Sequence, residues 1–178
     1  MVKRRAYLYV VVVVVLFLLG NPVSAQEKGG AGYFAGGVGW LLEYPDETSF
    51  LYSTGGGGHI ITDMWLIGGE GHASFGETAG GYGFFNVGYL VVKKEFVMVY
   101  PILGLGGGSM TSATSETVSS CALLNPAVGV DFLIPVKNNS GILLGLRGGF
   151  TFTIHQNDTF DWSMPHIRLI IGGYGFEG

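Results

Sequence analysis

Cysteine, proline and charge are all scarce in this sequence. Cys121 is the only cysteine in 178 residues, so the chain cannot form an intramolecular disulfide, and we interpret Cys121 as a small buried residue rather than a nucleophile. Only six prolines occur, and aromatic residues make up 13% of the chain, which argues against disorder. Charged residues make up only 12%, and acidic residues outnumber basic ones, which argues against a nucleic acid partner.

The N-terminus has the pattern of an export signal. Three basic residues at 3–5 precede an apolar run over residues 7–19, and the small-residue site Val23-Ser24-Ala25 follows. The run is shorter than the ~20 residues that a membrane-spanning helix needs, which disfavours a membrane anchor. We predict a signal peptide at residues 1–25, cleaved at its end, and one mature domain at 26–178. Three of the nine basic residues belong to the signal peptide, so the mature chain keeps six basic and all 13 acidic residues. Its net charge is therefore about −7.

Glycine is abundant, with 32 residues spread through apolar segments rather than confined to turns. The glycines follow no Gly-X-Y period, which excludes a collagen-like chain. Glycine inside strands marks bends or close approaches between backbones. A narrow barrel needs such positions because its interior is crowded.

The mature sequence divides into eight extended apolar segments. These are residues 33–42, 51–61, 65–75, 81–92, 96–109, 122–134, 142–155 and 166–176. The connections between them alternate between longer loops (43–50, 76–80, 110–121 and 156–165) and shorter turns (62–64, 93–95 and 135–141). This alternation predicts an all-β fold, an eight-stranded antiparallel up-and-down transmembrane β-barrel with both termini at the periplasmic side.

Alternation of side chains supports a barrel wall with one apolar face. In residues 142–155, one face carries Ile142, Leu144, Leu146, Gly148, Phe150, Phe152 and Ile154, and the other carries Leu143, Gly145, Arg147, Gly149, Thr151, Thr153 and His155. In residues 65–75 the apolar face begins at Trp65 and ends at Phe75, a span of ~33 Å along a strand or ~25 Å across a membrane at ~40° tilt. We therefore predict that Trp65 and Phe75 belong to aromatic girdles.

A soluble lipocalin-like barrel is the alternative architecture. Such a barrel would expose the aliphatic rows to water, at ~25 cal/mol per Å² of apolar surface. The polar side chains lie on the face opposite these rows, so the pattern favours lipid outside and a polar lumen inside.

The whole mature chain resembles the small eight-stranded outer-membrane β-barrel proteins of Gram-negative bacteria, typified by the transmembrane domain of outer membrane protein A. Its last strand, residues 167–176, resembles their C-terminal assembly signal, although Glu177 and Gly178 follow the terminal aromatic. A bulge at Gly172-Gly173 is expected to turn Tyr174 and Phe176 outward. The resemblance implies location in the outer membrane, contact with membrane lipids and lipopolysaccharide, recognition by the barrel-assembly machinery through this strand, and a monomeric state.

Five candidate residues are expected in the lumen: Glu70, His72, Asp131, Arg147 and Arg168. Buried charges must be paired, and the resemblance implies acid–Arg pairs that fill the lumen. A small-solute pore lined by these charges is the second interpretation. A third is a lipid-modifying enzyme, since His72 and Ser74 share a face and His155 and His166 flank the fourth outer loop. Positions two apart on a face are ~7 Å apart, too far for a His–Ser hydrogen bond, so we predict no enzyme.

The predicted outer loops carry acidic residues and no lysine or arginine. Their carboxylates (Glu43, Asp46, Glu47, Glu77, Glu116, Asp158 and Asp161) suit divalent cations shared with lipopolysaccharide, although a solvated loop surface explains the same bias. The sequence predicts no cofactor and no resident metal. The function it favours is a structural or surface-interaction role in the outer membrane.

Overall fold

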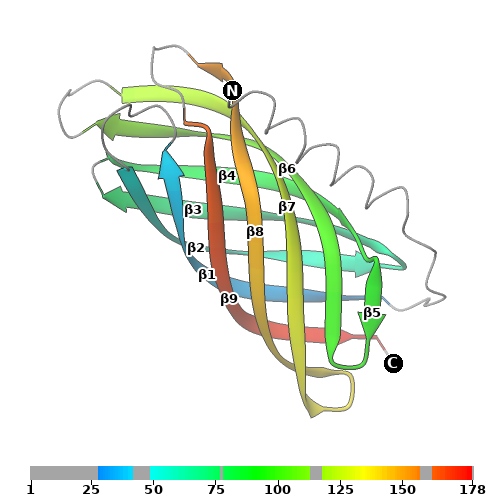
Figure 1. The fold of residues 1–178 in the computed structure, drawn as a ribbon. Helices are drawn as coiled ribbons and strands as arrows, with labels where there is room; N and C mark the ends of the chain where they lie inside the picture. Colours follow the sequence, from blue (N-terminus) through cyan, green and yellow to red (C-terminus); the bar gives the residue numbers. More distant parts are fainter. Residues whose placement is uncertain (1–27, 42–48, 77, 113–117, 157–161, 178) are drawn as a thin grey trace.

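The computed structural model describes residues 28–41, 49–76, 78–112, 118–156 and 162–177. Within them, nine strands form one closed antiparallel sheet (Figure 1): β1 (Lys28–Leu41), β2 (Ser49–Thr62), β3 (Trp65–Gly76), β4 (Thr78–Tyr89), β5 (Val92–Lys94), β6 (Val97–Ser112), β7 (Val118–Lys137), β8 (Ser140–Gln156) and β9 (Met164–Phe176). Each strand pairs with its neighbours, and β1 pairs with β9 to close the ring. β4 and β5 pair with successive parts of β6 and share one place in the wall. The result is the predicted eight-stranded antiparallel barrel.

The register of the ring fixes the tilt of the strands. Following paired residues once around the barrel, from Leu66 on β3 through every other strand, leads back to β3 at Gly76, ten residues further along. A stagger of ten residues over eight strands corresponds to a tilt of about 40°. This is the tilt at which a ten-residue strand crosses the apolar layer of a membrane.

Short turns join the strands at one end of the barrel, which we call the turn rim. Asp63 (φ 53°) and Asn139 (φ 63°) adopt left-handed conformations in the turns β2–β3 and β7–β8, as tight hairpins require. The opposite end, the loop rim, is where β1, β6 and β8 end and β2, β7 and β9 begin. The predicted longer loop at residues 76–80 is wrong, because only residue 77 separates β3 from β4. The predicted strand 81–92 is also broken, since Leu90 leaves the ladder and packs inside the barrel.

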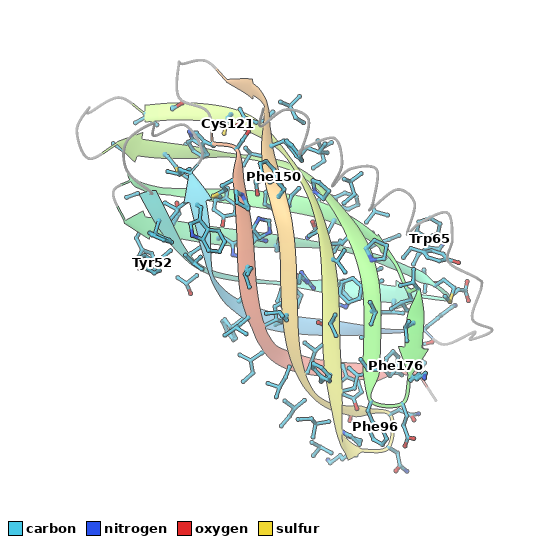
Figure 2. The ribbon with its side chains drawn as sticks, viewed as in Figure 1. Tyr52, Trp65, Phe96, Cys121, Phe150 and Phe176 are labelled. Carbon is cyan, nitrogen blue, oxygen red and sulfur yellow. The ribbon has the colours of Figure 1, made fainter. Side chains whose placement is uncertain are left out.

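The two faces of the wall are apolar outside and mixed inside. Large exposed side chains cover the outside (Figure 2), among them Phe34 (77% exposed) and Leu169 (69%). The inward rows of β7 and β8 are buried as their alternation predicted, from Leu123 to Leu133 and from Leu143 to Thr151, apart from partly buried glycines. Among the described residues, no helix is long and apolar enough to span a membrane.

Glycine makes room for the large inward side chains. Gly57 lies opposite Glu70, Gly129 opposite Tyr100, and Gly145 opposite Asp131. A Cβ at Gly129 would lie 2.5 Å from the Tyr100 ring, and one at Gly145 would lie 2.2 Å from Asp131 Oδ1. The glycines that the sequence spreads through its strands therefore complement the largest lumen residues across neighbouring strands.

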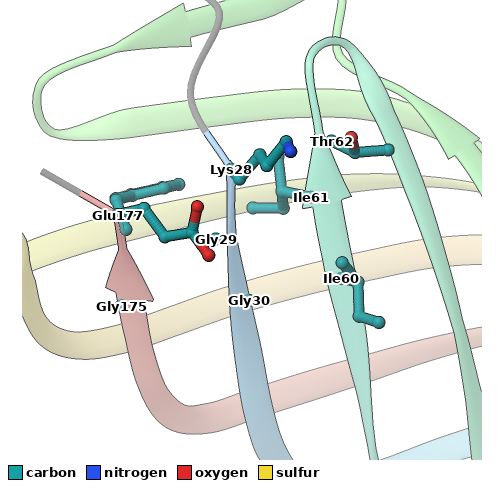
Figure 3. A pocket seen from close by; sticks show the side chains of 9 residues that line it. Lys28, Gly29, Gly30, Ile60, Ile61, Thr62, Gly175 and Glu177 are labelled. Carbon is teal, nitrogen blue, oxygen red and sulfur yellow. The ribbon is translucent and has the colours of Figure 1, made fainter.

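The C-terminal strand is regular, which corrects the expected bulge. β9 keeps one register with β8 and with β1 through Gly172 and Gly173. Tyr174 and Phe176 therefore share a face with Arg168 and close the lumen at the turn rim, where Lys93 Nζ lies 4.4 Å from the centre of the Phe176 ring. Beside them a pocket of about 630 Å³ opens between β1, β2 and β9, with Lys28 and Glu177 in its lining (Figure 3).

Candidate functional site

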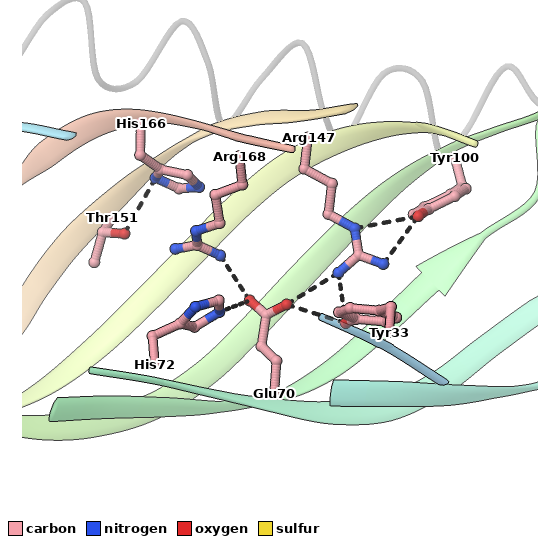
Figure 4. Close-up of polar contacts among 8 residues, drawn as sticks. All are labelled: Tyr33, Glu70, His72, Tyr100, Arg147, Thr151, His166 and Arg168. Carbon is pink, nitrogen blue, oxygen red and sulfur yellow. Dashed lines mark hydrogen bonds and ion pairs between the residues drawn. The ribbon is translucent and has the colours of Figure 1, made fainter. Parts of the chain in front are cut away.

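A connected group of polar side chains crosses the barrel interior, and we call it the lumen network (Figure 4). Its members come from six strands: Tyr33 of β1, Glu70 and His72 of β3, Tyr100 of β6, Asp131 of β7, Arg147 of β8 and Arg168 of β9. Each points inward by strand alternation and is at most 8% exposed. The network includes all five candidates that the sequence placed in the lumen, and adds Tyr33 and Tyr100.

Glu70 lies at the centre of the lumen network. Arg168 Nη1 donates to Glu70 Oε1 at 2.7 Å, and Arg147 Nη1 donates to Glu70 Oε2 at 3.0 Å. The hydroxyl of Tyr33 also donates to Oε2, at 3.1 Å. One carboxylate thus joins two guanidinium groups from neighbouring strands, which offsets the cost of burying all three charges.

Arg147 extends the lumen network to a second carboxylate through a tyrosine. Its Nε and Nη2 both donate to the hydroxyl oxygen of Tyr100, at 3.1 and 3.0 Å. The same hydroxyl donates to Asp131 Oδ2 at 2.7 Å. Arg147 Nη1 also donates to the Tyr33 hydroxyl at 2.7 Å, and the guanidinium carbon lies 4.6 Å from the centre of that ring. All three guanidinium nitrogens of Arg147 therefore donate hydrogen bonds.

Of the described histidines, His72 belongs to the lumen network and His166 lies beside it, and they form no catalytic relay among the described residues. His72 Nε2 is 3.5 Å from Glu70 Oε1, while Ser74 Oγ has no hydrogen-bond partner within the part of the chain that the structure describes. His166 Nδ1 is 3.4 Å from Thr151 Oγ1 and lies inside the wall. No group of three or more His, Cys, Asp or Glu in the described part of the chain could hold a metal ion.

Apolar clusters fill the lumen on both sides of the lumen network. Toward the turn rim, the cluster includes Met64, Leu66, Leu90, Met98 and Leu133, with Tyr174 and Phe176 packed against it. Toward the loop rim, a second cluster contains Leu41, Leu51, Tyr82, Phe84, Met110, Cys121, Leu123, Trp162 and Met164. The charges are thus enclosed by side chains from both ends.

The two tyrosines are the members that sequence analysis did not identify. Tyr33 and Tyr100 lie in glycine-containing segments whose two faces have no clear polar contrast. Tyr100 shares its strand face with Met98 and Ile102, and these apolar neighbours suggest only hydrophobic packing. Only the position of its hydroxyl between Arg147 and Asp131 shows a polar role.

The predicted aromatic girdle residues lie on the outer surface. Trp65 packs edge-to-face on Tyr89, with ring centres 5.3 Å apart, at the turn rim. Phe75 stacks with Tyr52 at 6.2 Å toward the loop rim. Figure 2 shows Trp65 and Tyr52 at opposite ends of the barrel. Trp65 and Phe75 are thus exposed at opposite ends of β3, and their place in membrane girdles stays a prediction.

Several predictions concern residues outside the described part of the chain. The signal peptide at 1–25 and the acidic residues of the outer loops both lie there. The side chain of His155 is likewise outside it.

Solved structures share this architecture. Neisserial surface protein A aligns with a TM-score of 0.56 at 12% identity, over 85% of this chain and 97% of that one. The N-terminal β-barrel domain of OprF from Pseudomonas aeruginosa aligns with a TM-score of 0.53 at 13% identity, over 81% and 96%. Ail, the attachment invasion locus protein of Yersinia pestis, aligns with a TM-score of 0.50 at 14% identity, over 85% and 99%.

These likenesses concern the fold. No protein-family model matches the sequence, and no curated protein matches it. The chain has the fold of the small eight-stranded outer-membrane β-barrels, as the resemblance in its sequence implied. This agrees with the predicted location in the outer membrane.

Proposed function

We propose that this protein is a monomeric outer-membrane barrel that acts as a rigid structural or surface-interaction element, with a lumen packed by side chains. The observation that carries the proposal is the enclosure of the lumen network between two apolar clusters. The lumen network contains two carboxylates and two guanidinium groups, so their formal charges cancel. The ion pairs of Glu70 with Arg147 and Arg168 link β3 to β8 and β9. The loop rim would then face the exterior on a stable base.

The outward face supports contact with membrane lipids. Closure satisfies the backbone hydrogen bonds inside a bilayer, and the exposed apolar rows avoid water only there. Lipopolysaccharide is the expected neighbour at the loop rim. Recognition by the barrel-assembly machinery through β9 remains part of the proposal, and the regular register of β9 offers Ile167, Leu169 and Ile171 as its outward row.

The packed lumen favours this role over a pore or an enzyme. A pore would need water to pass both apolar clusters. A His–Ser enzyme would need a relay, and Ser74 has no hydrogen-bond partner among the residues that the structure describes. The neighbours in fold, a surface protein and an attachment invasion locus protein by their names, are in keeping with a role at the cell surface.

Two measurements test the proposal. First, the protein should be recovered in the outer-membrane fraction and should change its mobility in SDS gels when boiled, as a closed barrel does. Second, the refolded protein in a planar lipid bilayer should give no steady single-channel conductance. A soluble, heat-insensitive protein would overturn the membrane location. A steady conductance that changes with Arg147→Ala would establish a pore instead.

A further inference from the structure

A groove of about 400 Å³ indents the outer surface across β1, β9, β8 and β7. Its lining includes Trp40, Pro126, Val128, Gly148, Pro165 and Ile167. These six lie on the outward face and are uncharged, and Gly149 with the buried residues Ala127, Phe150 and His166 completes the lining. We call it the lateral groove.

The strands themselves explain why the wall is indented here. Pro126 has no N–H to donate. The pairing of β7 with β8 is interrupted here, because no residues pair between the Leu124–Phe152 pair and the Ala127–Gly149 pair. On the other side of β8, Pro165 is paired with Phe150. Phe150 belongs to the outward row of β8, yet it is only 7% exposed. Its ring packs against Phe152, with the ring centres 4.4 Å apart.

Gly148 leaves the groove open where β8 crosses it. A Cβ built at Gly148 meets no heavy atom within 4 Å, whereas one at its neighbour Gly149 would lie 2.6 Å from the side chain of Ala127. The hollow is therefore present without any movement of side chains.

The position of the groove identifies what can occupy it. Trp40 is the next-to-last residue of β1, and Pro165 is the second residue of β9, so the groove lies in the half of the wall nearer the loop rim. It is continuous with the exposed apolar surface, since Ile167 belongs both to its lining and to the outward row of β9. At this depth in a membrane the surrounding medium is hydrocarbon.

We propose that the lateral groove binds one acyl chain of an outer-leaflet lipid. The inference rests on the proposed location of the barrel in a membrane. A preformed apolar hollow adds contacts with an acyl chain on several sides, which a smooth wall cannot offer, and requires no reorganisation of the protein. The chain would lie against Gly148 with Trp40 toward the membrane interface, where an indole is favoured.

The test is to fill the groove. Gly148→Phe should place its ring in the hollow without disturbing the backbone. The matched control is Gly71→Phe, because Gly71 also faces outward, on β3, and a Cβ there likewise meets nothing within 4 Å. Each protein is refolded in detergent, titrated with dimyristoyl phosphatidylethanolamine, and examined by native mass spectrometry.

The expected result is one saturable lipid on the unmodified barrel and on Gly71→Phe, with apparent affinity reduced at least tenfold in Gly148→Phe. Equal binding by both variants, or no saturable lipid on the unmodified barrel, would overturn the inference. The heat-dependent gel shift separates the two proposals: a barrel that shifts and inserts but binds no lipid in this way refutes only the groove. A protein that is not a membrane barrel refutes the proposed function first.

Discussion

The lumen network makes a sharp prediction about two arginines that look alike in the sequence. Arg147 and Arg168 lie on adjacent strands, are each 2% exposed, and each donate to Glu70. Arg147 makes four hydrogen bonds, to Tyr33, Glu70 and Tyr100. Among the described residues Arg168 makes one, and its Nε and Nη2 have no hydrogen-bond partner there.

The same substitution should therefore have very different costs at the two sites. Arg147→Met should lower the free energy of unfolding by about 3–5 kcal/mol, because it removes the group that links both carboxylates. Arg168→Met loses one charge-assisted hydrogen bond, worth about 1.5–3 kcal/mol, but also removes two buried nitrogens without partners. Because the loss of these unpartnered nitrogens offsets part of the cost, we expect Arg147→Met to cost more than Arg168→Met by about 2 kcal/mol.

Each variant is the other's control, since both change the lumen by the same charge and the same side chain. The assay is urea unfolding of the protein refolded in lipid vesicles, followed by tryptophan fluorescence, with gel mobility of unboiled samples as a second probe of closure. Equal slopes against urea would show that the two variants unfold from comparable states. If Arg168→Met costs as much as Arg147→Met, the lumen network is not organised around Arg147 and the reasoning fails.

Three further predictions use the same unfolding assay or simple labelling. Tyr100→Phe should lower stability by about 2–4 kcal/mol, because nitrogens of Arg147 and one oxygen of Asp131 lose their partner; a change below about 0.5 kcal/mol would show that the hydroxyl is dispensable. Gly145→Ala should destabilise by about 1–3 kcal/mol, since its Cβ would lie 2.2 Å from Asp131 Oδ1, while the same change at open Gly71 should stay within about 0.5 kcal/mol. Cys121 is 9% exposed, so a maleimide should label its thiol much more slowly in the folded barrel than in urea, and equal rates would contradict the inward orientation.

Much of the wall could be predicted from sequence because the pleat is a local property. The period of two along residues 122–134 and 142–154 identified the two faces that the structure shows, although Phe150, predicted on the outward face, is only 7% exposed. Trp65 and Phe75 were found in the same way, as the ends of one outward row. Where glycine removed the contrast between faces, as around Tyr33 and Tyr100, the sequence carried no such signal.

The C-terminal strand shows how this local reading fails. Aromatics near the chain end suggested an outward row, and a bulge was needed to reconcile Tyr174 and Phe176 with inward Arg168. β9 instead keeps its register, helped by the bond from Phe176 N to Asn139 O, and the aromatics close the lumen at the turn rim. Pairing with the neighbouring strands β1 and β8 therefore set the direction of these aromatic side chains, which composition could not predict.

The number of strands, their order and the lipid-facing side of the strands with clear alternation follow from the sequence, because alternation and turns are encoded within a few residues. Tertiary structure alone decided which inward side chains meet. Glu70 and Arg168 are 98 residues apart in the chain, and they meet because ring closure at β1–β9 sets a stagger of ten residues. The same closure positions Tyr100 between Arg147 and Asp131 and brings four strands together around the lateral groove. A register that accumulates around a whole barrel is a property of the closed ring, and no single segment contains it.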